Sequence, residues 1–324
     1  MRRARREILR AAAVAPVAGL LPGAPAAAAW PERPVRLIVT FPAGSLTDVL
    51  TRQVAEGLSR VLGQPVVVDN RAGAQGIVGI RALLGAPADG HTLVIVGVTT
   101  GATNVHLVKD LPYHPLRDLT PVGYIGESPY MLVAAPDLPA ADTNELLDLA
   151  RRRPGSVSFS YGSGSAQVAG ALLAKLAGVE VLPVPYRGGP EALNDVMAGR
   201  VGYTFTDFAN GLVQVREGRV RGLAVSTRDR FPLAAELPPV HDAVPSYDLS
   251  VWFSLAGPIG LPAPAVERLN GALAQVVLRP DLRERLARQG IGTRVMAAPE
   301  LRDFWAAEIE NWGRVVRLLG LEAQ

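Results

Sequence analysis

The sequence contains no cysteine among its 324 residues. This absence excludes disulfide bonds, thiol catalysis, cysteine-ligated metals and a lipoprotein anchor. Lysine is nearly absent too, because Lys109 and Lys175 are the two present and neither lies in a phosphate-binding loop. The histidines are dispersed over separate predicted loops: His91, His106, His114 and His241. No two of them lie at ligand spacing on one predicted element, so we expect no metal and no cofactor.

Signatures of catalysis are missing as well. No G-x-S-x-G nucleophile elbow and no G-x-x-x-x-G-K-S/T phosphate loop occurs. Gly162-Ser163-Gly164 begins like a dinucleotide-binding fingerprint, but Gln167 takes the place of its third glycine. We therefore predict a protein without catalytic residues. An enzyme on the same scaffold, using Asp48 or Asp207, stays open as the alternative.

Positive charge is concentrated at the N-terminus. Five arginines and one glutamate give residues 1–29 a net charge of +4, which leaves about −1 for the rest of a chain whose total is +3. The remainder therefore gives no indication of nucleic-acid binding. The arginines precede an apolar, alanine-rich stretch that ends in small residues, which is the pattern of an export signal peptide.

The segment Arg5-Arg6-Glu7-Ile8-Leu9-Arg10 resembles a twin-arginine export signal, and an ordinary Sec signal is the alternative. Prolines and glycines interrupt the apolar stretch, so we do not expect it to anchor the protein in a membrane. No later stretch reaches spanning length without charges. We predict a periplasmic protein that is soluble after signal removal.

The remaining chain alternates between predicted strands and helices. Val35–Thr40 is almost continuously apolar, as expected for a strand buried on both faces. Leucine or valine then recurs every fourth residue from Leu46 to Leu62, which predicts a helix with one buried face. Further strands are predicted at residues 66–68, 92–96, 130–134, 157–160, 181–184, 203–206, 223–225 and 252–256. This alternation predicts an α/β fold of open, mostly parallel sheets flanked by helices.

Proline-rich turns suggest where the chain passes between two lobes. We predict that residues 30–128 form the first part of lobe one and residues 129–249 form lobe two. Residues 250–324 are predicted to return to lobe one and to supply the C-terminal helices.

Two predicted strand-to-helix junctions carry loops of small residues, at Phe41–Asp48 and Gly162–Gln167. Unpaired backbone amides at a helix N-terminus, together with the helix dipole, favour a bound anion. The plain alternatives are a tight turn capped by Ser45 or Thr47, and a flexible Gly-Ser linker. Two such loops in one chain suggest two lobes that face one small acidic ligand.

Other residues join these loops as candidates. Arg187 is either a surface charge or the cationic wall of a pocket, and Asp207 is either a helix N-cap or a ligand contact. The full set of predicted ligand-binding residues is Phe41, Ala43, Gly44, Ser45, Thr47, Asp48, Thr99, Thr100, Gly162, Ser163, Gly164, Ser165, Gln167, Tyr186, Arg187 and Asp207.

A series of short motifs, in order along the chain, resembles the Bug (Bordetella uptake gene) family. These are extracytoplasmic solute-binding proteins associated with tripartite tricarboxylate transporters. The motifs are Trp30-Pro31-Glu32-Arg33-Pro34-Val35-Arg36, Phe41-Pro42-Ala43-Gly44 with Thr47-Asp48, the segment 63–71, Asp89-Gly90-His91-Thr92-Leu93, the segment 111–115, Val184-Pro185-Tyr186-Arg187-Gly188, Ala224-Val225 and Trp252-Phe253. Each motif is short, and their order and spacing make the match specific.

The resemblance implies a two-lobed, type II-like periplasmic-binding-protein fold with the ligand in the cleft. It implies a small carboxylate as ligand, gripped through backbone amides and bridging waters. Permease subunits or the ectodomain of a sensor protein are the implied partners, and we expect a monomer. This chain departs from the family pattern in three places: Ser45 stands where a second glycine is common, Gln167 near where histidine is frequent, and Arg187 where lysine is common.

Overall fold

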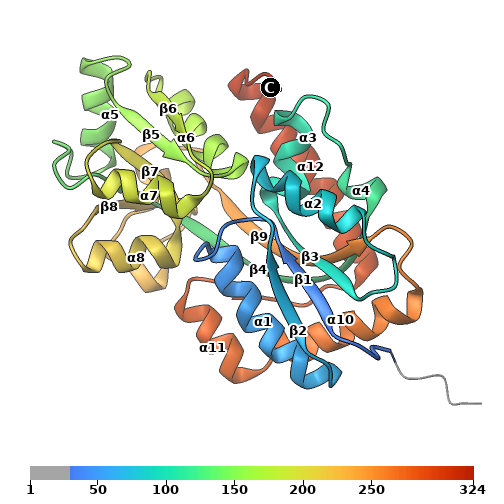
Figure 1. Cartoon of the computed structure of the whole chain (residues 1–324). Helices are drawn as coiled ribbons and strands as arrows, with labels where there is room; N and C mark the ends of the chain where they lie inside the picture. Colours follow the sequence, from blue (N-terminus) through green and yellow to red (C-terminus); the bar gives the residue numbers. More distant parts are fainter. Residues whose placement is uncertain (1–29) are drawn as a thin grey trace, which may run out of the picture.

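The computed structural model describes residues 30–324, in which two lobes lie side by side (Figure 1). The predicted export signal at residues 1–29 lies outside the described residues. Each lobe consists of a sheet covered by helices, which confirms the predicted α/β class.

The first lobe is built around β1 (Val35–Val39), which is parallel to β2 (Val66–Asn70) on one side and to β3 (Thr92–Gly97) on the other. The next strand, β9 (Ser250–Pro258), is antiparallel both to β3 and to β4 (Leu119–Ala134). The short strand β10 (Gly292–Thr293) also pairs with β4 in antiparallel fashion.

The second lobe begins where β4 continues past the first. Its later residues pair in antiparallel fashion with β7 (Tyr203–Asp207) and β8 (Arg221–Val225). Beyond β7 lie β5 (Ser158–Tyr161) and β6 (Leu182–Pro185), which run parallel to each other. The sheets are therefore mixed, and the prediction of mostly parallel sheets was wrong for the strands at the centre.

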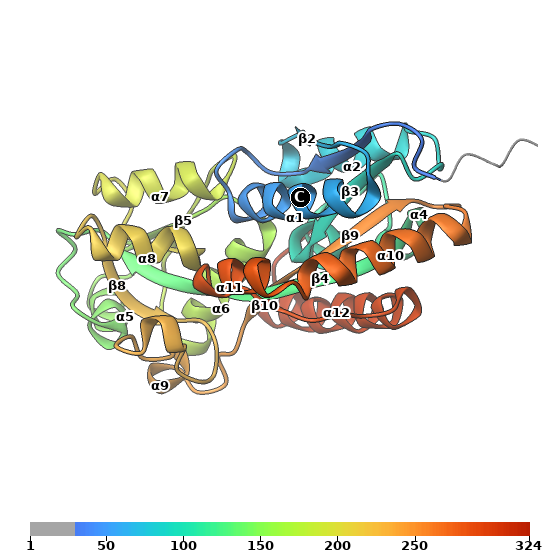
Figure 2. The ribbon, with the colours of Figure 1, turned by 90° about the horizontal axis from the view of Figure 1, so that it is seen from below.

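The antiparallel centre follows from how the chain crosses between the lobes. β4 pairs with β9 as far as Pro129, whose partner is Ser250, and from Tyr130 onward it pairs with β7. A strand that re-enters beside the exit point of another has to run in the opposite direction. Figure 2 shows β4 extending through both lobes.

The sequence predicted the last five residues of β4 and missed the earlier ones. Pro121, Gly123, Gly126 and Pro129 interrupt this part of the sequence, and such residues normally indicate turns. In the structure they coincide with shifts of register between β4 and β9 at Pro121/Gly123 and at Tyr124/Gly126. Bulges of this kind absorb residues that a regular ladder cannot hold.

Helices cover both faces of the sheets. The first lobe contains α1 (Leu46–Leu62), η1 (Ala74–Gly76), α2 (Ile77–Leu84), η2 (Thr99–Thr103), α3 (Asn104–Leu107), α4 (Pro115–Asp118), α10 (Ala263–Val277), α11 (Pro280–Arg288) and α12 (Ala298–Leu319). The second contains α5 (Thr143–Arg152), α6 (Gly164–Ala177), α7 (Gly189–Met197), α8 (Phe208–Arg216), η3 (Pro232–Ala234) and α9 (Val240–Ala243). Asp142 caps α5, because its carboxylate accepts a hydrogen bond from the Glu145 amide at 2.9 Å.

The predicted apolar face of α1 is buried. Leu50 and Val54 have no exposed surface, and Leu58 is 1% exposed. Burying such a side chain stabilises the fold by roughly 1.5–3 kcal/mol. On the other side of the sheet, the rings of Trp252 and Trp305 stack with centroids 6.3 Å apart and attach α12 to β9. The helix that carries the candidate loop therefore packs against a buried core.

Within residues 30–324, no helix combines the length and the apolar character needed to cross a membrane.

Candidate functional site

The loop before α1 is held open by two local features. Gly44 adopts a φ of +80°, a left-handed conformation in which side chains are strained. Ser45 then caps the helix, because its hydroxyl accepts a hydrogen bond from the Asp48 amide at 3.3 Å. Of the two residues predicted as caps, Ser45 holds this position and Thr47 lies in the first turn. Within the described chain, the Thr47 amide has no hydrogen-bond partner and is available to a ligand.

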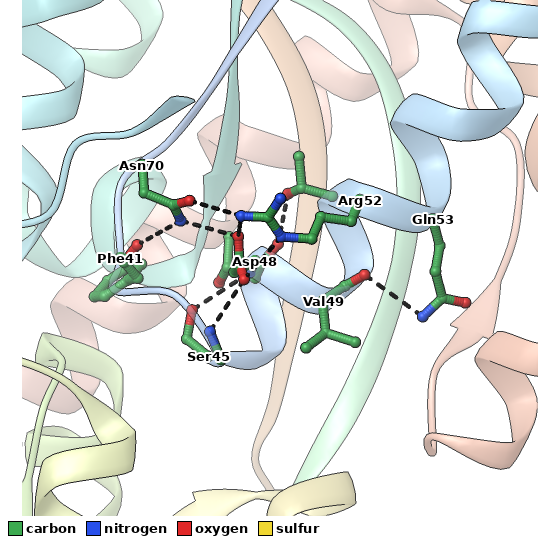
Figure 3. Close-up of polar contacts among 10 residues, drawn as sticks. Phe41, Ser45, Asp48, Val49, Arg52, Gln53 and Asn70 are labelled. Carbon is green, nitrogen blue, oxygen red and sulfur yellow. Dashed lines mark hydrogen bonds and ion pairs between the residues drawn. The ribbon is translucent and has the colours of Figure 1, made fainter. Parts of the chain in front are cut away.

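Asp48 fixes this loop from inside the first lobe (Figure 3). Its carboxylate accepts hydrogen bonds from the Gly44 amide at 3.0 Å, the Asn70 side chain at 2.9 Å and Arg52 Nε at 3.2 Å. Burial favours a higher pKa for Asp48, but these hydrogen bonds and the charge of Arg52 outweigh it and lower the pKa below 3.8. All three of these hydrogen bonds are internal to the lobe, so Asp48 supports the loop rather than facing a cavity.

The second loop begins α6 in a similar way. Ser163 caps the helix by accepting a hydrogen bond from the Ala166 amide at 3.3 Å. The neighbouring Ser165 hydroxyl lies 2.8 Å from the Tyr130 hydroxyl and 3.0 Å from Thr99 Oγ1, which belongs to the first lobe. Burial, together with the negative charge of Asp207, raises the pKa of Tyr130 to about 12. Tyr130 is therefore a neutral hydroxyl at the wall between the lobes.

A backbone contact joins the α6 loop to the start of α7. A Cβ added at Gly162 would collide with the main chain of Gly188 and Gly189. Glycine at this position allows the two loops to meet. The N-termini of α6 and α7 consequently lie next to each other.

Asp207 connects the second lobe to the first loop. It ends β7 and occupies the N-cap position of α8, but its side chain makes no capping bond there. Instead, its Oδ2 accepts a hydrogen bond from the Leu46 amide at the start of α1, at 3.0 Å. Burial raises the pKa of Asp207, and the Leu46 amide opposes that rise. A second contact across the lobes runs from Asn210 Nδ2 to the Gly44 carbonyl at 3.4 Å.

These elements enclose a cavity of about 60 Å³ between the lobes, which we call the inner cavity. Its lining residues are Phe41, Ser45, Thr47, Gly97, Val98, Thr99, Tyr130, Gly162, Ser163, Ser165, Ala166, Gly189, Ala192, Thr204, Phe205, Thr206, Asp207, Val251 and Phe253.

The first turns or caps of α1, α6, α7 and α8 all reach the inner cavity. Each helix N-terminus carries the equivalent of roughly +0.5 elementary charge. No lysine, arginine or histidine appears among the lining residues of this cavity, and Asp207 is its acidic group. Backbone amides and hydroxyls therefore provide the attraction for an anion.

A larger cavity of about 820 Å³, the outer cavity, shares Gly162 with the inner one. It is lined by Gly73, Ala74, Gln75, Ile77, Leu107, Val108, Tyr161, Gly162, Gln167, Pro185, Tyr186, Arg187, Glu191, Glu322 and Gln324. Both lobes and the C-terminal residues contribute to its walls.

The predicted ligand-binding residues fall into three groups in the structure. The inner cavity is lined by Phe41, Ser45, Thr47, Thr99, Gly162, Ser163, Ser165 and Asp207. The outer cavity is lined by Gln167, Tyr186 and Arg187, again with Gly162. Neither cavity is lined by Ala43, Gly44, Asp48, Thr100 or Gly164.

Several residues that line the inner cavity were not predicted from the sequence. Tyr130 carries a hydroxyl inside an otherwise apolar strand, which is the signal that could have identified it. Thr204 and Thr206 lie on β7 immediately before Asp207 and carry a similar polar signal. Val251 and Phe253 reach the cavity from β9, far along the chain, and no local pattern indicates this.

Within residues 30–324, no three histidine, aspartate or glutamate side chains are grouped so that they could hold a metal ion. The arrangement provides hydrogen-bond donors in a closed space between two lobes. This arrangement of donors is suited to binding an anion.

Comparison with known proteins agrees with this geometry. Residues 50–321 match the family model described as "Tripartite tricarboxylate transporter family receptor". Protein BugT of Bordetella pertussis is 34% identical over 298 residues, covering 90% of each chain.

Solved structures show the same fold. An R. palustris protein solved with adipate is 32% identical, with a TM-score of 0.88, covering 91% of this chain and 100% of the other. The structure described as "periplasmic binding protein BugD" is 27% identical, with a TM-score of 0.86 over the same shares of the two chains. The chain therefore belongs to the tripartite tricarboxylate transporter receptor family and is a two-lobed solute-binding receptor rather than an enzyme.

Proposed function

We propose that this receptor captures a small organic acid, with the ligand's carboxylate held in the inner cavity, and delivers it to a tripartite tricarboxylate-type permease. The observation that carries the proposal is the convergence of the α1, α6, α7 and α8 N-termini on a cavity without cationic side chains. Amides fixed at helix N-termini bind anions without the desolvation cost of a buried ion pair. The structural relative solved with adipate, a carboxylate, supports the same ligand class.

The proposed binding residues follow from the two cavities. Thr47, Ser163 and Ser165 donate to the carboxylate through amides or hydroxyls, and Thr99 and Tyr130 hold the hydroxyl of Ser165 in place. Ser45 and Asp48 support the loop from behind. Gln167, Tyr186 and Arg187 contact the part of the ligand that extends into the outer cavity.

We further propose that the lobes move about the crossover strands, with residues 30–128 and 250–324 in one lobe and residues 129–249 in the other. Pro129 and Ser250 pair where β4 and β9 cross between the lobes, which supports the placement of the hinge there. Interlobe contacts such as Leu46 with Asp207 are then made on closure and broken on opening.

The proposed cellular location rests on the relatives of this chain and on its N-terminal sequence. Relatives are periplasmic binding proteins, and residues 1–29 carry the sequence pattern of an export signal. We expect the exported protein to act in the periplasm as a monomer. A permease is the partner that the family implies. The alternative partner is the ectodomain of a sensor protein that recognises the closed, ligand-bound receptor.

Native mass spectrometry and thermal denaturation test the proposed function together. Protein purified under gentle conditions should carry a small acid, and added carboxylates should raise the melting temperature where the matched primary amides do not. A ligand at a hundred times its Kd stabilises the fold by about 2.7 kcal/mol. Amides that stabilise the protein as strongly as the acids, or no response to any acid at millimolar concentration, would refute the proposal.

A further inference from the structure

The two cavities differ greatly in size where they meet at Gly162. The inner cavity, at about 60 Å³, offers about the space of two water molecules. That is room for a carboxylate group. The outer cavity, at about 820 Å³, has room for the rest of a ligand. A ligand anchored by its carboxylate in the inner cavity therefore places its body in the outer one.

Several apolar side chains line the outer cavity, beside polar ones such as Gln75, Gln167 and Gln324. Ile77 and Leu107 contribute aliphatic side chains from the first lobe, and Tyr161 and Tyr186 contribute rings from the second. The Tyr186 hydroxyl already donates a hydrogen bond to Asp195, so its ring is the surface left for a ligand. These side chains favour an apolar body, since removing apolar surface from water is worth roughly 25 cal/mol per Å².

The charges around the two cavities oppose a second carboxylate on the ligand. Asp207 lines the inner cavity, and Glu191 and Glu322 line the outer one. Arg187 is the one cationic side chain among the described lining residues of either cavity, and it is exposed to solvent. Glu191 and Glu322 are exposed as well, so a distal carboxylate would meet two acidic side chains and one guanidinium, a net repulsion that solvent weakens.

We propose that the ligand is a monocarboxylate with an uncharged, largely apolar body, whose carboxylate occupies the inner cavity and whose body occupies the outer cavity. This inference rests on the proposed function and narrows its ligand class. It separates this chain from the relative solved with adipate, which has a carboxylate at each end.

Calorimetric titration of the exported protein with hexanoate and adipate tests this inference, because the two acids have the same chain length and differ in the second carboxylate. Hexanoate should bind at least about tenfold more tightly than adipate, a difference of ~1.4 kcal/mol. Hexanoate should also exceed acetate, which fills the inner cavity alone. Adipate binding as tightly as hexanoate, or acetate binding as tightly as hexanoate, overturns the inference and leaves the proposed function standing. Failure of all three acids to bind removes the proposed function itself.

Two neighbouring residues of α2 provide a matched pair of variants. Ile77 lines the outer cavity, whereas Val78 is 44% exposed and lines neither cavity. Ile77→Ala should weaken hexanoate binding by about tenfold, whereas Val78→Ala should leave it unchanged. Equal effects of the two substitutions contradict an apolar contact in the outer cavity. If Ile77→Ala fails to fold, the comparison of hexanoate with adipate on the unmodified protein still decides the question.

Discussion

The carboxylate of Asp207 accepts a hydrogen bond from the amide of Leu46, 161 positions away in the sequence, at 3.0 Å. Leu46 is the first residue of α1 in one lobe, and Asp207 ends β7 in the other. The bond therefore joins the two lobes at the wall of the inner cavity and uses one amide of the α1 N-terminus. The adjacent Thr47 amide, unpartnered within residues 30–324, stays available to a ligand.

Neutralising Asp207 should stabilise the protein at neutral pH. Burial raises the pKa of this carboxyl above 3.8, so the folded state binds its proton more tightly than the unfolded state does. The stability from Asp207 is then fully present below the unfolded pKa and is lost as pH rises through the folded pKa. Asp207→Asn retains an oxygen acceptor for Leu46 and should raise the melting temperature at pH 7 by about 2 °C.

The gain from Asp207→Asn should shrink toward acid pH and disappear below about pH 3.8, where both states carry the proton. Asp242→Asn, at an exposed position on α9, serves as the control and should change little at any pH. Thermal denaturation from pH 3.5 to 8 measures both variants. A lower melting temperature of Asp207→Asn at pH 7 contradicts the sign of this linkage.

Removing the charge of Asp48 should have the opposite pH dependence. Burial would raise its pKa, but hydrogen bonds from Arg52, Gly44 and Asn70 prevail and lower it. Its stabilising contribution is therefore present above the unfolded pKa of 3.8 and is lost as pH falls through the lower folded value. Asp48→Asn should cost roughly 1–3 kcal/mol at pH 7, because donors aimed at the carboxylate lose their partner.

The matched control for Asp48 lies on the same helix. Glu56 is 50% exposed and pairs with Arg60, so Glu56→Gln should change the unfolding free energy by less than about 0.5 kcal/mol. Urea denaturation at pH 7 and at pH 3.5 gives the comparison. A cost of Asp48→Asn that persists unchanged at pH 3.5 would show that charge is not its source.

Substituting Gly162 should separate the loops that join the two cavities. A Cβ there overlaps the backbone of Gly188 and Gly189, and backbone cannot move aside as a flexible side chain can. We expect Gly162→Ala to cost roughly 1–3 kcal/mol of stability and to weaken carboxylate binding. Gly271→Ala on α10 is the control, because its added methyl meets nothing within 4 Å and should be neutral or slightly stabilising. Equal stabilities of the two variants would contradict the close approach.

A double-mutant cycle should reveal coupling between Ser165 and Tyr130. Ser165→Ala leaves the buried Tyr130 hydroxyl without its partner at 2.8 Å, at a cost of roughly 1–3 kcal/mol. Adding Tyr130→Phe removes the unsatisfied group, so the double variant should be less destabilised than the sum of the single ones. Denaturant unfolding of the three variants measures the coupling energy. Strict additivity would mean that the two hydroxyls do not depend on each other.

Local patterns in the sequence identified the parts of the site that are themselves local. The four-residue spacing of α1 and the cap at Ser45 both depend on neighbours within a few positions, and both are present. The small-residue loops before α1 and α6 do reach one cavity. Glycine, serine and threonine at a strand-to-helix junction restrict the backbone wherever the junction lies in the fold.

In the long strand β4, local sequence patterns fail to predict the structure. Pro121 and Gly126 predict turns, yet pairing with β9 holds both residues in a bulged strand. Nonlocal hydrogen bonds outweighed local propensity there. The position of Asp48 shows the same limit, because Asn70 and Arg52 turn its carboxylate into the lobe.

The sequence by itself determined the α/β class, the helix N-termini that can hold an anion and the lack of catalytic or metal-binding patterns. It could not decide that Asp207 meets Leu46, that Tyr130 joins the cavity wall, or that Arg187 faces the outer cavity. Those relations join residues that are distant in the chain. They depend on how the two lobes meet across the crossover strands, and no local spacing of side chains encodes that geometry.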